Sequence, residues 1–132
     1  MDEVKATNHF AKRIQFHDVA LRDGEQQTRL VFTEDQKVAL AEKMAEAGMP
    51  AVSPQDAAAI KEIVKRNLGP QIFAFARCMK EDVQRVVDCG VKHIVMEVPA
   101  SEHIIKYAYK WDLERAVALS VEATQYAKQN GL

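Results

Sequence analysis

Apolar and polar positions alternate in some stretches of the chain and recur at helical spacing in others, and the two patterns take turns along the sequence. Residues 14–21 alternate up to Asp18 and then become apolar, which predicts a first strand. Residues 72–76 and 93–98 are short, mostly apolar runs, typical of strands in a parallel sheet. The sequence therefore predicts three strands.

Five further segments carry apolar residues at helical spacing. The predicted helices cover 34–47, 54–68, 81–89, 102–109 and 113–129. Thr33 and Gln36 form a capping box before the first helix, and Ser53 followed by proline is a start signal for the second. Asp112 is the expected cap of the last helix.

Strands and helices alternate, and their connections are too long for hairpins, so the predicted class is α/β with parallel strands and right-handed crossovers. Between the first two helices, residues 48–52 are too few and too interrupted by proline to hold a strand and its turns, so the alternation skips one strand there. A closed (β/α)8 barrel needs about 250 residues. The 132 residues therefore predict one domain, 1–132, which is either a small open sheet or a part of a barrel.

The composition narrows the classes of partner. Lys and Arg number 18 against 19 Asp and Glu, which gives a formal charge of -1 and removes the electrostatic reason to expect nucleic acid or a membrane surface. No apolar run approaches the roughly 20 residues that span a bilayer, and the first residues do not resemble a secretion signal, so we expect a cytoplasmic protein. Cys78 and Cys89 lack CxxC spacing, which favours free buried thiols over a disulfide or a zinc site.

Residues that follow the predicted strands are the candidates for chemistry, because parallel α/β proteins bind ligands beyond the carboxyl ends of their strands. They are Arg22, Asp23, Glu25 and Gln26, then Arg77 and Cys78, then Glu97, Ser101 and His103. Arg22 beside Asp23 places a bidentate carboxylate binder next to a hard oxygen ligand for a divalent cation. This combination suits a 2-oxo acid held on a metal. The alternative is a solvated loop pair, with Gly24 as a turn residue.

The string HDVALRDGEQ, residues 17–26, resembles the signature D-x-x-L-R-D-G-E-Q at the first strand of a family of metal-dependent (β/α)8 barrels. This family includes 2-isopropylmalate synthase, homocitrate synthase and hydroxymethylglutaryl-CoA lyase. Further similar segments are 33–48, 53–60, 75–78 and 98–107. The resemblance covers almost the whole chain but only about the first half of the family's barrel. It implies a partial (β/α)8 barrel with about three strands and four or five helices.

The resemblance also implies an activity in amino-acid biosynthesis: acyl-CoA-dependent condensation with a 2-oxo acid, or the reverse lyase reaction, with a divalent ion (Mg²⁺, Mn²⁺ or Zn²⁺). Asp23 stands at the position of the family's strand-one metal ligand. Arg22 stands at that of the arginine that engages the keto acid and steadies developing oxyanion charge. Gln26 and Arg77 match residues that would contact the substrate, whereas Glu97, Ser101 and His103 are weaker candidates.

The sequence departs from the family pattern in three places. The family's second strand carries a glutamate that pairs with the strand-one arginine, and residues 49–52 contain none, so we expect Arg22 to lack this partner. None of the four histidines forms the His-x-His pair of the family's metal site, so Asp23 alone would bind an ion weakly. Met79 replaces a histidine found in homocitrate synthases. The second hypothesis is therefore an inactive barrel fragment or deletion variant that buries its strand edges as a homo-oligomer.

Overall fold

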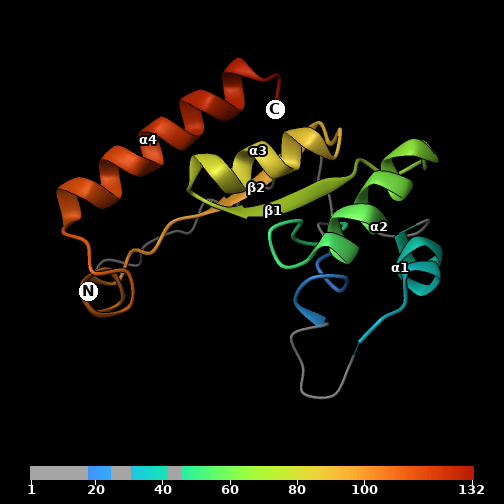
Figure 1. Cartoon of the computed structure of the whole chain (residues 1–132), viewed down its shortest axis with the longest axis horizontal. Coiled ribbons are helices and arrows are strands. Elements are labelled where there is room, and N and C mark those ends of the chain that lie inside the picture. The colour runs from blue at the N-terminus through green and yellow to red at the C-terminus, as the bar shows by residue number, and fades with distance from the viewer. Residues whose placement is uncertain (1–17, 25–30, 42–45) are drawn as a thin grey trace, which may run out of the picture.

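The computed structural model describes residues 18–24, 31–41 and 46–132. Its elements in chain order are α1 (Glu34–Ala41), α2 (Pro54–Lys65), β1 (Phe73–Arg77), α3 (Lys80–Asp88), β2 (His93–Glu97), the π-helix η2 (Ile104–Ala108) and α4 (Leu113–Gln129). In Figure 1, α3 lies over the two strands and α4 runs beside α3, whereas α1 and α2 lie together near the other end. The described residues thus form an α/β structure with two strands and five helices.

Three predicted helix starts are confirmed by their capping contacts. The Thr33 backbone N–H donates to the Gln36 side chain at 3.0 Å, and the Gln36 N–H donates back to the Thr33 hydroxyl at 3.3 Å. The Ser53 hydroxyl accepts from the backbone N–H of the third helical residue, and Asp112 caps α4 in the same way at 2.7 Å. These bonds satisfy backbone donors that have no partner inside the first helical turn.

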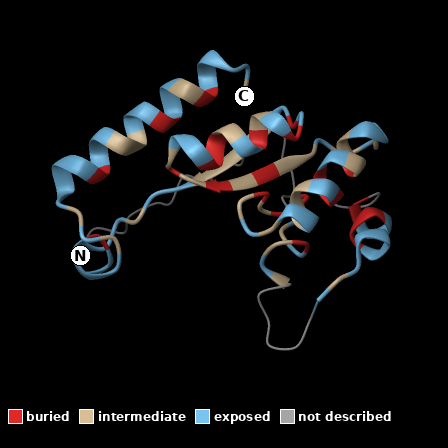
Figure 2. Cartoon of the chain, viewed as in Figure 1, coloured by how far each residue is buried: buried red, intermediate tan, exposed pale blue. Residues whose placement is uncertain are grey.

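The two strands are parallel, as the sequence predicts, and they pair in register from Phe73 with His93 to Arg77 with Glu97. Alternation along β1 buries Ala74 and Ala76 completely and leaves Phe75 half-buried on the opposite face. The small alanine side chains let the helices approach the sheet closely. Buried residues, coloured red in Figure 2, form a core between the strands and the helices. The other face of the sheet, with Phe73, Phe75 and Val95, is called the open face below.

Two predictions near the N-terminus are wrong: the strand at residues 18–21 and the end of the first helix. Residues 18–21, the described part of the first predicted strand, form a loop and a turn; the remainder, 14–17, lies outside the described residues. The described part of the first helix is Glu34–Ala41, and residues 46–48 are not helical, although the prediction extended the helix to 47. Residues 46–48 are buried, but in an extended segment and not on the face of a helix.

This extended segment occupies the place of the strand that the alternation was expected to skip. Glu46 forms a parallel bridge with Phe73, and its N–H donates to the Asp18 carbonyl at 3.1 Å. The Phe75 N–H donates to the Gly48 carbonyl at 2.9 Å, so the segment joins residue 18 to β1. Gly48 has φ +113, where a side chain would be strained. A short strand-like connection therefore exists where the sequence predicted none.

The remaining elements agree with the sequence to within a few residues. The predicted 81–89 helix is α3, and α4 has the predicted bounds 113–129. The predicted 102–109 helix is mainly the π-helix η2, which two α-helical residues, 102 and 103, precede. No helix among the described residues is long and apolar enough to cross a membrane.

Candidate functional site

Arg22 lies at the edge of the sheet, in the turn that follows residue 19, and its side chain is one-fifth exposed. Its Nε donates to the Oε1 atom of Glu46 at 2.7 Å. Glu46 is 1% exposed, so this ion pair is largely removed from water and fixes one edge of the guanidinium. The prediction that Arg22 lacks a glutamate partner is therefore wrong: Glu46 supplies it.

Glu46 is the functional residue that the sequence reasoning missed. It lies in the predicted first helix because the apolar spacing of residues 38–45 runs straight into it. The glycine two residues after Glu46 was a sequence signal for a break in the helix. In the structure Gly48 has a positive φ and ends the extended segment. Glu46 lies three positions before residues 49–52, where the pattern of the family predicts the glutamate.

A second contact holds the Arg22 guanidinium on its other side. Its central carbon lies 4.4 Å from the centre of the Phe75 ring, on the open face of the sheet. An arginine over an aromatic face is attracted by the negative potential of the ring. Glu46 from the extended segment and Phe75 from β1 therefore fix the same cation from two directions.

Asp23 lies beside Arg22 but is 61% exposed on its side chain. Its Oδ1 is 3.3 Å from Nη1 of Arg22, so part of its charge is already engaged. Among the residues that the structure describes, no group of three His, Cys, Asp or Glu side chains is placed to hold a metal ion. One exposed carboxylate is a weak ligand for a divalent cation. The described residues alone therefore do not fit a metal centre.

Arg77 ends β1 and is held by Asp82 in the first turn of α3. Its Nε and Nη2 donate to the two carboxylate oxygens at 2.6 and 3.1 Å. The Asp82 side chain is 3% exposed, and its hydrogen bond raises the pKa of the Arg77 guanidinium. Two of the guanidinium nitrogens of Arg77 thus connect the strand to the next helix.

The other predicted residues lie along the same end of the sheet or beyond it. Glu97 ends β2 in register with Arg77 and is exposed. Ser101 and His103 are exposed near η2, where the His103 ring lies 4.7 Å from the Tyr107 ring. Gln26 and Glu25 lie outside the described residues. The structure brings Arg22, Asp23 and Glu46 together and leaves Ser101 and His103 with local contacts.

Cys78 and Cys89 are free and buried, as the sequence predicts. Burial raises the pKa of both thiols above the usual 9.0, because a thiolate would lose its hydration there. Cys78 follows β1 directly, and the amide N–H of Cys78 donates to the Glu97 carbonyl. Neither thiol has the exposed, electropositive surroundings of a reactive cysteine.

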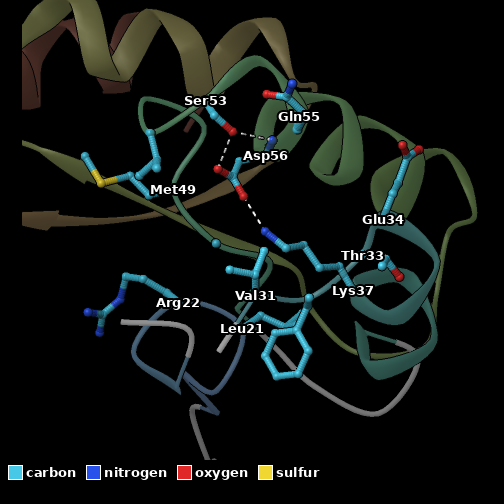
Figure 3. Close-up of a pocket in the computed structure, with 13 residues that line it drawn as sticks. Leu21, Arg22, Val31, Thr33, Glu34, Lys37, Met49, Ser53, Gln55 and Asp56 are labelled. Atoms are coloured by element: carbon cyan, nitrogen blue, oxygen red, sulfur yellow. Dashed lines mark hydrogen bonds and ion pairs between the residues drawn. The ribbon is translucent and has the colours of Figure 1, made fainter. Parts of the chain in front are cut away.

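A pocket of about 570 Å³ lies between the start of α1 and the start of α2, and Arg22 is one of the residues that line it. Leu21, Phe32 and Met49 contribute apolar surface to its wall. Lys37 and Asp56 form an ion pair across it, and Asp56 also accepts a hydrogen bond from the Ser53 hydroxyl at 2.6 Å. In Figure 3 the Arg22 guanidinium lies at one side of the pocket, turned away from the Lys37–Asp56 pair.

Comparison with known proteins now places this site in a family. The family model described as HMGL-like matches residues 13–132 of the chain. The chain belongs to the HMGL-like family. The match includes the Arg22-Asp23 pair, the extended segment with Glu46 and both strands, so the site described above lies within the family domain.

Curated relatives of this HMGL-like chain carry the names of synthases. It is 38% identical over 128 residues to a probable 2-isopropylmalate synthase of Ignicoccus hospitalis, with 92% of this chain and 32% of the relative covered. It is 37% identical over 130 residues to a putative (R)-citramalate synthase of Methanosphaerula palustris. This alignment covers 93% of this chain and 26% of the relative.

A third relative is a homocitrate synthase of Methanocaldococcus jannaschii, 35% identical over 129 residues, with 92% of this chain and 32% of the relative covered. The chain therefore spans about a third or less of the length of these relatives. The predicted resemblance to this group of synthases is confirmed.

Proposed function

We propose that the chain supplies the N-terminal part of an acyl-CoA-dependent condensing synthase, in which Arg22 binds the carboxylate or keto oxygen of a 2-oxo acid. The observation that carries this proposal is the Arg22–Glu46 pair at the edge of the sheet. A guanidinium held at a fixed place is a preorganised ligand for an anion. The names of the relatives, 2-isopropylmalate, citramalate and homocitrate synthases, support this class of reaction.

The charge of Arg22 fits the electrostatic demand of such a reaction. Addition of an acyl-derived carbanion to a ketone converts the keto oxygen into an alkoxide. A cation already in place stabilises that charge without reorganisation during the step. Gln26 and Arg77 are the proposed further substrate ligands. Arg77 would use the part of its guanidinium that Asp82 leaves available, since Asp82 binds Nε and Nη2.

A divalent ion is the proposed cofactor, with Asp23 as the one ligand among the described residues. When bound, such an ion would add positive charge beside the developing oxyanion. The described residues do not form a centre for it, so the role of Arg22 stands on its own contacts. Glu97, Ser101 and His103 are proposed as residues that line the same end of the sheet.

The barrel assignment is also a proposal, supported by the local geometry. Residue 18, the extended segment at 46–48, β1 and β2 follow one another across the sheet in the order of the chain. Sequential parallel neighbours with intervening helices are the arrangement of a (β/α)8 barrel. In this proposal the open face, with Phe75 and Val95, faces the barrel interior.

A calorimetric titration tests the proposed function. Pyruvate, 2-oxoisovalerate and 2-oxoglutarate are titrated into the chain with and without Mn²⁺. We expect saturable binding of at least one acid, loss of it in Arg22→Met, and loss of the Mn²⁺ dependence in Asp23→Asn. The matched control is Arg66→Met, which removes an arginine paired with Glu62 at the exposed end of α2. Absence of binding up to millimolar acid, or equal binding by Arg22→Met, contradicts the proposal.

The second candidate is a non-catalytic, self-associating fragment, and an observation supports it too. Apolar residues Leu113, Val117 and Val121 recur every fourth position of α4 and are each at least 49% exposed. Exposed apolar surface of this kind marks an interface. Sedimentation across a concentration series tests it: a concentration-dependent oligomer supports this candidate, and a stable monomer contradicts it.

A further inference from the structure

The position of Phe75 relative to Arg22 is not explained by packing alone. Alternate residues of β1 fill the core with alanine, and Phe75 places a large ring on the open face, beneath the Arg22 guanidinium. The backbone that carries this ring is well anchored. The Phe75 N–H donates to the Gly48 carbonyl at 2.9 Å, and β1 pairs with Val95 of β2 at this residue. The ring therefore projects from a fixed backbone position toward the cation, whose central carbon lies 4.4 Å from the ring centre.

The hydrogen bond to Glu46 by itself leaves the plane of the Arg22 guanidinium free to rotate. A bond at Nε fixes one edge of the planar group, but the plane can still rotate about that edge. Contact with the face of an aromatic ring restricts this rotation, because the flat cation stacks on the ring. Glu46 and Phe75 therefore restrain both the place and the tilt of the guanidinium, and the exposed Asp23 adds a longer contact of 3.3 Å to Nη1.

We propose that Phe75 is a positioning residue for substrate binding, which sets the orientation of the Arg22 guanidinium through its ring face. This inference rests on the proposed function, because it assigns to Arg22 the 2-oxo acid carboxylate. Phe75 touches no reacting atom; it acts through Arg22. An aliphatic side chain at residue 75 would keep the apolar contact and lose the attraction for the cation.

The test uses Phe75→Leu, Phe75→Trp and, as a matched control, Phe73→Leu. Phe73 lies two residues earlier on the same face of β1, and its ring centre lies 5.0 Å from that of His93 in a tilted arrangement. Two properties are measured on each variant: the ¹H–¹⁵N signal of the Arg22 side-chain Nε–H, which reports ring currents and order, and the Kd for the 2-oxo acid that the wild-type chain binds. Circular dichroism confirms that each variant is folded.

The expected results differ between the variants. Phe75→Leu shifts and broadens the Arg22 Nε–H signal and raises the Kd about five-fold, the size of a partly exposed cation–π contact. Phe75→Trp restores an ordered signal and brings the Kd to within about two-fold of wild type, because indole is the strongest of the aromatic partners. Phe73→Leu changes neither property. Rescue by tryptophan is not expected from a purely structural role.

Each contrary outcome has a definite meaning. If Phe75→Leu leaves the Arg22 signal unchanged, or if Phe73→Leu alters it equally, the positioning role of Phe75 is overturned. If the signal changes but the Kd does not, the contribution of this orientation to substrate binding is overturned. If the wild-type chain binds no 2-oxo acid while the Arg22 signal responds to Phe75→Leu, the proposed function fails and the orientation by Phe75 stands.

Discussion

Replacing Arg22 by methionine removes a cation that is paired with a buried carboxylate and keeps most of the apolar stem. Glu46 is 1% exposed and accepts from Arg22 at 2.7 Å, so the variant leaves its charge without this partner in a poorly hydrated place. Breaking a buried ion pair from one side costs about 3–5 kcal/mol. Because the Arg22 side chain is one-fifth exposed, we expect the lower end, about 3 kcal/mol of unfolding free energy.

Two further variants turn this into a sharp test. Replacing both partners, as Arg22→Met with Glu46→Leu, should recover most of the loss, since the buried charge is gone. Arg66→Met is the matched control: its Nε lies 3.0 Å from Glu62, but both side chains are about a third exposed or more, so it should cost about 0.5 kcal/mol or less. Urea unfolding followed by circular dichroism measures all three.

The result that would refute this reasoning is a loss in Arg22→Met as small as that in Arg66→Met. A double variant that is no more stable than Arg22→Met would also contradict the assigned pair. Either outcome would mean that Glu46 is hydrated or paired elsewhere in solution. The Arg22 side chain would then not be held in the place from which we argue its function.

Four other outcomes are expected. Asp82→Asn should lower the unfolding free energy by about 2 kcal/mol, because it weakens charge-assisted bonds to a 43% exposed arginine; a loss below 0.5 kcal/mol in urea titration would contradict the clamp between β1 and α3. Asp112→Ala should cost about 1 kcal/mol by removing the cap of α4, and thermal unfolding that matches wild type would show the cap to be unimportant. Burial raises the pKa of Cys78 and Cys89 in the folded chain, so the contribution of these two thiols to stability should be constant below about pH 8 and fall above about pH 9, where the unfolded thiols ionise before the folded ones. Native thiols should also react with a disulfide reagent far more slowly than unfolded ones, and equal rates would contradict their burial.

The order of elements was predictable because local signals and tertiary packing agree over most of the chain. The caps at Thr33, Ser53 and Asp112 specify helix starts through contacts within four residues, and each is present in the structure. The apolar runs that became β1 and β2 are short and bounded by polar residues, so their ends were visible too. Such features depend only on neighbours in sequence.

The extended segment at 46–48 could not be predicted in the same way. Its backbone bonds go to Asp18 and Phe73, residues distant in the sequence, and its own composition continues the helical pattern before it. Tertiary contacts therefore override local spacing at this point. The error propagated to the site, since Glu46 was assigned to a helix and Arg22 was left without a partner.

The site itself was partly visible in the sequence. Arg22 and Asp23 were identified by their types and by the motif around them. Phe75 was assigned only as a residue of a buried strand, because which face it occupies depends on the register with β2 and on the turn that brings Arg22 over it. Side-chain pairs between distant segments require the fold, and the Arg77–Asp82 clamp is the exception since it spans only five residues.

A crystal structure of the chain grown with Mn²⁺ and the 2-oxo acid that it binds would test the central claim most directly. We expect the carboxylate or keto oxygen within hydrogen-bonding distance of the Arg22 Nη atoms, with Nε still on Glu46 and the guanidinium over the Phe75 ring. An acid bound away from Arg22, or an Arg22 side chain released from Glu46 into solvent, would contradict the account.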